Sequence, residues 1–278
     1  MLQRLGQGLG DLLYLLLPRR RREARINIAL AFPKRTAQQQ ERLLRAHFRA
    51  FGSTILESSL AWWGDDQRLL PFAQFHGLEH LEAARAKGRG VILVSGHFAA
   101  FEIGGRLLNA HQPLTFMYKR QRRNPLFEAM VSRRREHYYR GAIPHDDLRA
   151  FMRALRRGEV CWMLPDQDFG QRASVFAPFM GIPAMTVITP ARLAAATGAA
   201  VVPYVPRRLP QGRGYDIRIL PELKQFPTGH DVRDATRINA LLQSWARAMP
   251  AQYLWLHRRF KTRPAGQPSL YPERRRRR

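Results

Sequence analysis

Short apolar segments that alternate with helical patterns constrain this fold more than any other feature of the sequence. Segments rich in β-branched and aromatic residues predict strands at 90–97, 113–120, 159–167, 200–208 and 215–223. Helical patterns lie between or after them, at 98–110, 123–140, 145–157, 186–197 and 232–248. Because strands that alternate with helices form parallel sheets, we expect an α/β fold with a mostly parallel central sheet flanked by helices.

A helical segment is predicted before the sheet. Residues 36–63 begin with a threonine cap and keep apolar residues at helical spacing, which predicts a long amphipathic helix, and a short helix is expected near 78–87. With 278 residues, 45% of them hydrophobic, the chain is long enough for one large core. We therefore expect a single domain over 1–264 with an N-terminal helical part over 1–75, and a basic C-terminal tail over 265–278.

The charge of the chain indicates anionic partners. Its 47 Lys and Arg against 21 Asp and Glu give a net charge of +26, which suits nucleic acid, anionic lipid headgroups, phosphorylated substrates or acidic proteins. Much of the arginine lies in clusters, for each of which a solvated surface is the alternative: 19–23, 119–123, 132–137 and 274–278. Cys161 is the single cysteine, which excludes an intramolecular disulfide and a cysteine-based zinc site. No metal or cofactor is expected.

The N-terminal 18 residues favour contact with a membrane surface over a membrane span. No window holds the roughly 18 apolar residues that a spanning helix needs. The apolar run over 12–17 is followed by four arginines, which is the wrong order for a secretory signal. We interpret this segment as a helix that lies in a membrane interface with its arginines near anionic headgroups, and an ordinary core helix is the alternative.

The stretch SGHFAAFEIGG over 95–105 places His97 and Glu102 in a small, apolar setting directly after a predicted strand. Ligands of open α/β sheets bind outside the carboxyl ends of strands, so this position favours function. On one helix the two residues would point about 140° apart, so we expect His97 in a turn and Glu102 on the first turns of the next helix. The carboxylate can then reach one imidazole nitrogen. A core histidine with a surface glutamate is the alternative.

A histidine oriented by a carboxylate is suited to general-base chemistry. The carboxylate fixes the imidazole tautomer, and the other nitrogen takes a proton from a hydroxyl. Ser95 is close, but VSGH lacks the Gly-x-Ser-x-Gly elbow that exposes a nucleophilic serine. A hydroxyl of the substrate is therefore the better acceptor, which favours direct acyl transfer from a thioester without an acyl-enzyme intermediate.

An ordered set of motifs resembles one protein family. The pair His97-x4-Glu102 resembles the signature of the glycerolipid acyltransferase superfamily, and its surroundings resemble the late acyltransferases of lipid A biosynthesis, the lauroyl and myristoyl transferases. The matching blocks are NIALAFP (27–33), WW (62–63), Arg-x-x-x-Asn-Pro (120–125), LPDQDFG (164–170), SVFAPFMGIPA (174–184), VPYVPRR (202–208) and QYLWLHRRFKTRP (252–264). The resemblance covers about residues 5–264.

This resemblance implies a reaction and its partners. The expected enzyme moves a fatty acyl chain from an acyl carrier protein thioester to a hydroxyacyl hydroxyl of a Kdo-bearing lipid A precursor. The expected place is the cytoplasmic face of the bacterial inner membrane, with the chain attached peripherally to the anionic membrane surface. His97 is implied to be the general base and Glu102 its partner.

The resemblance also implies residues that bind substrate. Arg120 and Asn124 belong to the Arg-x-x-x-Asn-Pro element, where a guanidinium can hold the acceptor or stabilise an oxyanion. Asp166 and Asp168 are expected to shape the rest of the site, although a turn capped by acids is the alternative. Three candidates line the acyl chain, with ordinary core as the alternative: Phe176, Phe179 and Met180.

Two other functions fit parts of the sequence. The superfamily also includes enzymes that acylate other lipids or glycolipids. The charge alone allows a basic nucleic-acid-binding protein, and LHRRFKTRP suits either a phosphorylated sugar or RNA phosphates. Nucleic acid is the less favoured partner, because it gives no reason for the pair of His97 and Glu102.

Overall fold

The structure is a computed structural model that describes residues 2–120 and 124–272. Its helices are α1 (Leu2–Leu16), α2 (Pro18–Ala31), α3 (Ala37–Trp63), α4 (Asp66–Leu69), η1 (Leu70–Phe72), α5 (Leu78–Arg85), α6 (Phe101–His111), α7 (Pro125–Tyr138), α8 (Leu148–Arg156), α9 (Thr189–Thr197), η2 (Pro210–Gly212) and α10 (Asp231–Ala248). Its strands are β1 (Ala73–His76), β2 (Val91–Val94), β3 (Leu114–Tyr118), β4 (Gly141–Pro144), β5 (Val160–Met163), β6 (Ser174–Phe179), β7 (Ile182–Val187), β8 (Ala200–Arg208) and β9 (Tyr215–Ile219).

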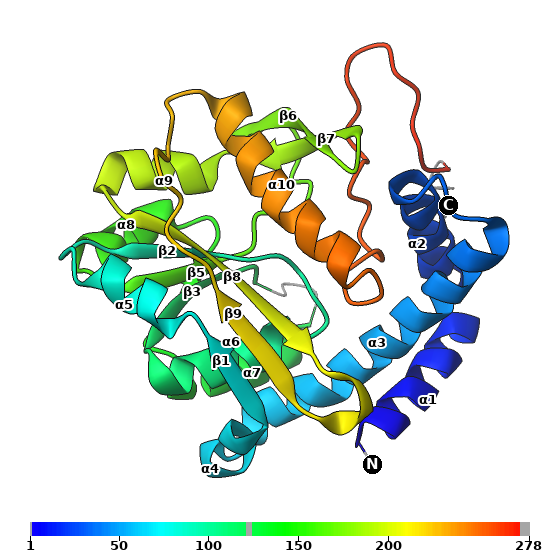
Figure 1. The fold of residues 1–278 in the computed structure, drawn as a ribbon, viewed down its shortest axis with the longest axis horizontal. Coiled ribbons are helices and arrows are strands. Elements are labelled where there is room, and N and C mark those ends of the chain that lie inside the picture. Colours follow the sequence, from blue (N-terminus) through cyan, green and yellow to red (C-terminus); the bar gives the residue numbers. More distant parts are fainter. Residues whose placement is uncertain (1, 121–123, 273–278) are drawn as a thin grey trace.

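A seven-stranded sheet forms the centre of the molecule, in the order β1-β9-β8-β2-β5-β3-β4 (Figure 1). Adjacent strands pair in parallel except β8 and β9, which are antiparallel. The expected α/β fold with a mostly parallel sheet is confirmed. Helices α1 and α2 lie to one side of the sheet, and the long α3 connects them to it (Figure 1).

Helices cover both faces of the sheet, and β2 shows why its sequence VILV is apolar throughout. Ile92 and Val94 belong to a core cluster that includes residues of α8, α9 and α10. Val91 and Leu93 belong to a second cluster, formed with residues of α5 and α6. Successive side chains of a strand point to opposite faces, so a central strand buried on both faces has no polar position.

The sequence patterns did not predict β1, β4 or the separate hairpin of β6 and β7. The hairpin occupies most of the apolar tract 174–187, and α9 begins only at Thr189. Met180 and Gly181 join its strands, with φ values of 54° and 80°. Positive φ at both central residues is the requirement of the two-residue turn that suits a hairpin. The strands β1 and β4 have four residues each, too few to show a clear period.

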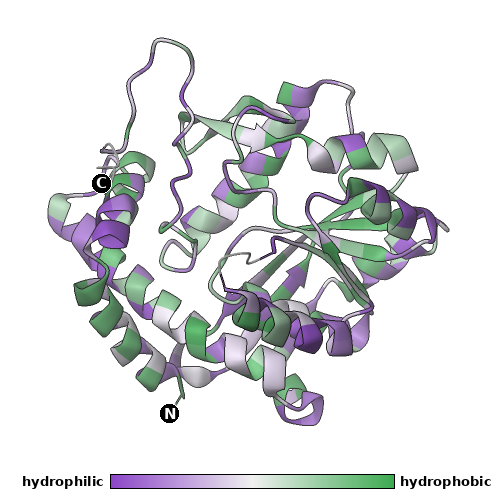
Figure 2. Cartoon of the chain, turned by 180° about the vertical axis from the view of Figure 1, so that it is seen from behind, coloured by the Kyte–Doolittle hydropathy of each residue, from purple (hydrophilic) through white to green (hydrophobic). Residues whose placement is uncertain are grey.

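The N-terminal helix α1 has one packed and one exposed face. Its buried residues Gly6 and Gly10 face α3, where a Cβ added at Gly52 would lie 2.3 Å from backbone atoms of both. On the other face, leucine side chains are 50% to 66% exposed: Leu5, Leu12, Leu15 and Leu16. In Figure 2 this helix, which begins at the N label, shows much green. No helix in the described part of the chain is long and apolar enough to cross a membrane.

His47 makes the stability of the fold depend on pH. This buried residue of α3 donates a hydrogen bond from Nδ1 to the carbonyl oxygen of Ala251, 3.1 Å away. Burial disfavours the imidazolium and lowers the pKa of His47 from 6.5 to about 4, although the Ala251 carbonyl acts against it. Below pH 6.5 the unfolded chain binds a proton that the folded chain does not. This histidine therefore destabilises the fold progressively as the pH falls from 6.5 to about 4.

We expect the wild type to lose on the order of 3 kcal/mol more stability than His47→Asn when the pH falls from about 7.5 to about 4.5. Asparagine keeps a donor for Ala251 but does not take up a proton in the unfolded state. Urea unfolding of both proteins at both pH values measures the difference. An equal loss in the two proteins would show that His47 does not couple folding to protonation.

Candidate active site

A turn after β2 carries His97 at the carboxyl end of the sheet. The backbone N–H of His97 donates to Oδ2 of Asp166 at 2.8 Å, and its Nδ1 lies 2.6 Å from Oδ1 of the same carboxylate. Asp166 follows β5, the neighbour of β2 in the sheet. One carboxylate therefore fixes both the turn and the orientation of the imidazole ring.

This contact assigns the two imidazole nitrogens of His97. A carboxylate accepts hydrogen bonds, so Nδ1 carries the proton and Nε2 holds a lone pair. Nε2 lies 3.2 Å from the side-chain nitrogen of Gln167, which can donate to it. The imidazole is 21% exposed, so Nε2 belongs to a group that a substrate can reach. Neutral His97 thus has the tautomer that a general base needs.

The Asp166 carboxylate is almost fully buried, at 2% exposure. Burial raises its pKa, but the interaction with the imidazole of His97 and the two hydrogen bonds from that residue outweigh burial and lower the pKa below its ordinary value. The group therefore stays ionised, and a carboxylate in this position can stabilise a protonated imidazole.

Glu102 does not contact His97 as the sequence had suggested. It lies in the first turn of α6, and its carboxylate accepts hydrogen bonds from Trp62 Nε1 at 2.7 Å and from Arg135 Nη2 at 3.0 Å to both oxygens. Because the helix begins at Phe101, the side chain of Glu102 points toward α3 and α7. The Phe101 ring lies beside the imidazole of His97, with ring centroids 5.6 Å apart. The orienting partner of His97 in the structure is Asp166.

A cavity of about 600 Å³ lies at this edge of the sheet, and both His97 and Glu102 line it. Much of its wall is apolar or aromatic, including Phe101, Phe116, Trp162, Met163, Leu164 and Phe169. A cavity of this size and lining has room for an apolar ligand beside the histidine. The partly buried ion pair of Glu102 and Arg135 adds a charged wall on the side of α6 and α7.

The other predicted site residues have different surroundings. Arg120 is exposed and its side chain makes no hydrogen bond or ion pair with another described residue, and Asn124 caps α7 by accepting a hydrogen bond from the N–H of Phe127 at 3.0 Å. Asp168 is buried and accepts hydrogen bonds from the backbone N–H and the hydroxyl of Thr262, both at 2.9 Å. Asp168 therefore anchors the C-terminal segment next to the site.

The three residues expected to line an acyl chain lie outside this cavity. Phe179 and Met180 are buried in the core, where the Phe179 ring packs on Tyr253 and Phe260. Phe176 is half-buried on β6, which packs against α10. Among the described residues, the apolar wall of the cavity comes mainly from β3, β5 and the segments that follow them, with additions from Phe101 of α6, Leu148 of α8 and Val187 of β7.

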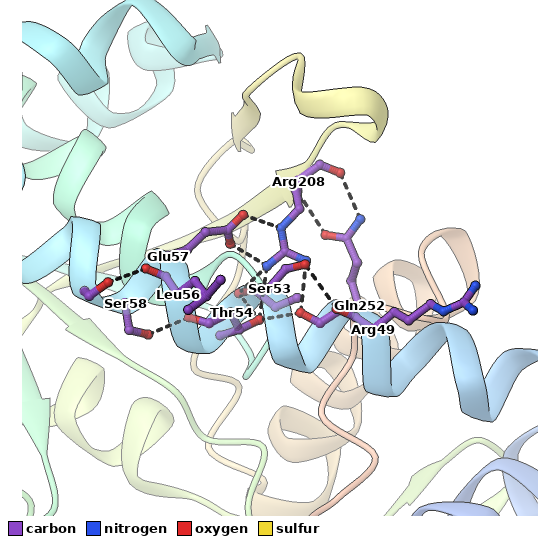
Figure 3. Close-up of polar contacts among 11 residues, drawn as sticks. Arg49, Ser53, Thr54, Leu56, Glu57, Ser58, Arg208 and Gln252 are labelled. Carbon is purple, nitrogen blue, oxygen red and sulfur yellow. Dashed lines mark hydrogen bonds and ion pairs between the residues drawn. The ribbon is translucent and has the colours of Figure 1, made fainter. Parts of the chain in front are cut away.

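A network of polar side chains links α3, the end of β8 and the segment after α10 (Figure 3), and it reaches Ala99, two residues after His97. Arg208, at the end of β8, forms an ion pair with Glu57 of α3, with Nε 2.6 Å from Oε1, and its Nη2 also contacts the Thr54 hydroxyl. The Thr54 hydroxyl donates to the Ala99 carbonyl at 2.8 Å, and the Ala99 N–H donates to the Gln252 carbonyl at 2.6 Å. The side-chain amide of Gln252 in turn accepts a hydrogen bond from the backbone N–H of Arg208 and donates one to the backbone carbonyl of Arg208.

Several residues of the site were not identified from the sequence as such. Trp62 and Arg208 stand within quoted motifs, and Gln167 lies between the two named aspartates, so the family blocks were the available signal. Arg135 stands in an arginine cluster that had a solvated surface as its alternative. The structure gives it a carboxylate partner and places its guanidinium 5.2 Å from the centre of the Phe116 ring.

The fold and this site together define the chain as an α/β protein with a carboxylate-oriented histidine beside a largely apolar cavity. A family model described as bacterial lipid A biosynthesis acyltransferase matches residues 1–262. The chain belongs to this family, which confirms the resemblance seen in the motifs and the expectation of an acyltransferase.

Curated relatives agree over almost the whole chain. The chain is 35% identical over 272 residues to a lipid A biosynthesis lauroyltransferase of Escherichia coli, covering 98% of this chain and 89% of the relative. It is 35% identical over 268 residues to a palmitoleoyltransferase of the same organism, covering 96% and 87%. A myristoyltransferase of that organism is 28% identical over 254 residues, covering 90% and 78%.

Proposed function

We propose that this acyltransferase moves a fatty acyl chain from an acyl carrier protein thioester to the hydroxyl of a hydroxyacyl chain on a Kdo-bearing lipid A precursor. The observation that carries the proposal is the pair of His97 and Asp166 at the wall of the 600 Å³ cavity. The pair supplies a base for a substrate hydroxyl, and the cavity has room for an apolar chain.

The proposed reaction is a direct transfer. The acceptor hydroxyl oxygen bonds to the thioester carbonyl carbon while its proton passes to Nε2 of His97. The tetrahedral intermediate then collapses, the carbon–sulfur bond breaks, and the leaving thiolate takes the proton from the imidazolium. Asp166 holds the ring and stabilises its charge during this exchange.

Glu102 and Arg135 are proposed to support the same step from the opposite side. Their ion pair lies at the cavity wall, so the guanidinium can stabilise negative charge on the thioester oxygen while Glu102 fixes its position. Arg120 and Asn124 are proposed to contact the acceptor at the end of β3, where Lys119 already lines the cavity.

An acyl-transfer assay with purified protein tests this function. The wild type is given acyl carrier protein thioester or coenzyme A thioester, and mass spectrometry follows the gain of one acyl chain on the Kdo-bearing precursor. We expect transfer with the carrier-protein donor and none to a precursor that lacks hydroxyacyl chains. Equal use of both donors would contradict the carrier-protein assignment, and transfer to the precursor without hydroxyacyl chains would contradict the acceptor.

We also propose that α1 contacts the anionic cytoplasmic face of the inner membrane. Its exposed leucines form one row, and the arginines at 19–22 follow directly. Such a helix places apolar side chains among lipid chains and arginines among headgroups.

Replacing Leu12 by glutamate is expected to weaken partition onto vesicles of anionic phospholipid by about tenfold, because a leucine side chain is withdrawn from the lipid and a carboxylate that the anionic surface repels is added. Vesicle sedimentation measures this. Val232→Glu is the matched control, since Val232 is 53% exposed but lies at the start of α10. Equal weakening by both substitutions would contradict the role of α1.

A further inference from the structure

A group of basic side chains lines the same cavity as His97. Strands β3 and β4 end side by side, with Tyr118 paired to Pro144, and the N–H of His145 donates to the Tyr118 carbonyl at 2.8 Å. Lys119 and His145 follow these two strands and both line the cavity. The two residues therefore project from neighbouring strands at the carboxyl edge of the sheet.

The loop after β5 completes the group. Its Phe169 ring packs beside the His145 ring, with centroids 6.0 Å apart, and Arg172 lines the same cavity. We call Lys119, His145 and Arg172 the basic cluster. Three separate segments of the chain thus bring basic side chains to the wall of one cavity.

These basic groups lack partners in the part of the chain that the structure describes. No hydrogen bond or ion pair joins the side chain of Lys119 or Arg172 to another described residue. Nδ1 of His145 is buried and has no hydrogen-bond partner there either. The carboxylates of the cavity wall are engaged, since Glu102 pairs with Arg135 and Asp146 makes an interaction of its own. A buried polar atom without a partner and two unpaired cations together fit an anionic ligand.

We propose that the basic cluster binds a phosphate group of one of the two substrates. Arginine offers a planar fork, lysine a compact charge and histidine a directed N–H, which together suit a phosphate monoester or diester. The proposal rests on the proposed acyl transfer, in which both the phosphorylated sugar of the acceptor and the phosphodiester arm of the carrier protein bring such a group.

The sheet sets the scale of the arrangement. His97 follows β2 and His145 follows β4, three strand steps away in the order β2-β5-β3-β4. Neighbouring strands are roughly 4.8 Å apart, so a phosphate held between the ends of β3 and β4 lies about 10 to 14 Å from His97. The cluster thus binds a part of the substrate remote from the chemistry, and its loss should raise KM more than it lowers kcat.

Matched substrates identify the phosphate. The wild type and the double variant Lys119→Gln/Arg172→Gln are assayed with acceptors that carry or lack sugar phosphates. They are also assayed with acyl-phosphopantetheine and acyl-pantetheine as donors. In the wild type we expect removal of the bound phosphate to raise KM by about 10- to 100-fold, and in the variant to have little effect. If the double variant no longer responds to the sugar phosphate, the cluster binds the acceptor; if it no longer responds to the pantetheine phosphate, the cluster binds the donor. A KM that still depends on both phosphates in the double variant would overturn the proposal.

Binding of inorganic phosphate provides a readout that does not need turnover. We expect the phosphorus resonance of inorganic phosphate to broaden with the wild type and to stay sharp with the double variant. Arg233→Gln is the matched control and should broaden the resonance as the wild type does, because Arg233 is an exposed residue of α10 outside the cavity lining. Equal broadening by the double variant would count against the cluster. If wild type transfers no acyl group to any acceptor, the proposed function fails, whereas the binding result still decides whether the cluster holds phosphate.

Discussion

Replacing His97 by asparagine is expected to lower acyl-transfer turnover by about 10²- to 10⁴-fold, which is the usual contribution of a general base. Asparagine keeps a donor for the buried Asp166 carboxylate, so the thermal melting temperature should stay close to that of the wild type. The backbone hydrogen bond from residue 97 to Asp166 is also retained. Turnover measured at saturating donor and acceptor separates this loss from weaker binding. Wild-type turnover in His97→Asn would exclude the mechanism.

The carboxylate that acts with His97 is decided by comparing Asp166→Asn with Glu102→Gln. Asp166→Asn offers an amide donor to Nδ1 and favours the tautomer with the proton on Nε2, so we expect a loss as large as that of His97→Asn. Glu102→Gln keeps the acceptor for Trp62 and removes only the charge beside Arg135, so its loss should be smaller. A larger loss in Glu102→Gln would instead identify Glu102 as the partner of the base.

The pH dependence of turnover gives a second test of the same pair. A base must be unprotonated, so turnover of the wild type should fall at acid pH as the imidazole takes up a proton. His97→Asn has no imidazole to protonate, so its residual turnover should lack this acid limb. An unchanged acid limb in His97→Asn would mean that a group other than His97 is responsible for it.

The position of His97 could be predicted from the sequence because it depends on local patterns. The run VILV, buried on both faces, indicates a central strand, and the residues after such a strand lie where ligands of α/β sheets bind. The contact with Asp166 could not be read in the same way. The two residues are 69 positions apart, and they meet because β2 and β5 are neighbours in the sheet, which no local pattern specifies.

The direction of Glu102 and the lining of the cavity depend on tertiary packing. Glu102 turns away from His97 because α6 begins at Phe101 and because Trp62 and Arg135, from two other helices, offer it donors. Phe179 belongs to a tract whose apolar composition fits core and acyl lining equally well. Only the hairpin of β6 and β7 shows that this residue packs inward.

Breaking the ion pair of Arg208 and Glu57 is expected to cost about 3–5 kcal/mol of stability, because both side chains are 7% exposed and the remaining charge would be buried without a partner. Urea unfolding of Arg208→Met measures the loss. Arg49→Met is the matched control, since Arg49 pairs with Asp11 at the surface and should contribute no more than about 1 kcal/mol.

The double variant Arg208→Met/Glu57→Met separates charge burial from shape. It leaves no unpaired charge, so we expect it to be more stable than Arg208→Met alone. It still lacks the guanidinium contacts with Thr54 and the Ala50 carbonyl, so the turn of Ala99 loses part of its support. Turnover of the double variant should therefore stay below that of the wild type while its stability recovers. Recovery of both would show that this network stabilises the fold without positioning His97.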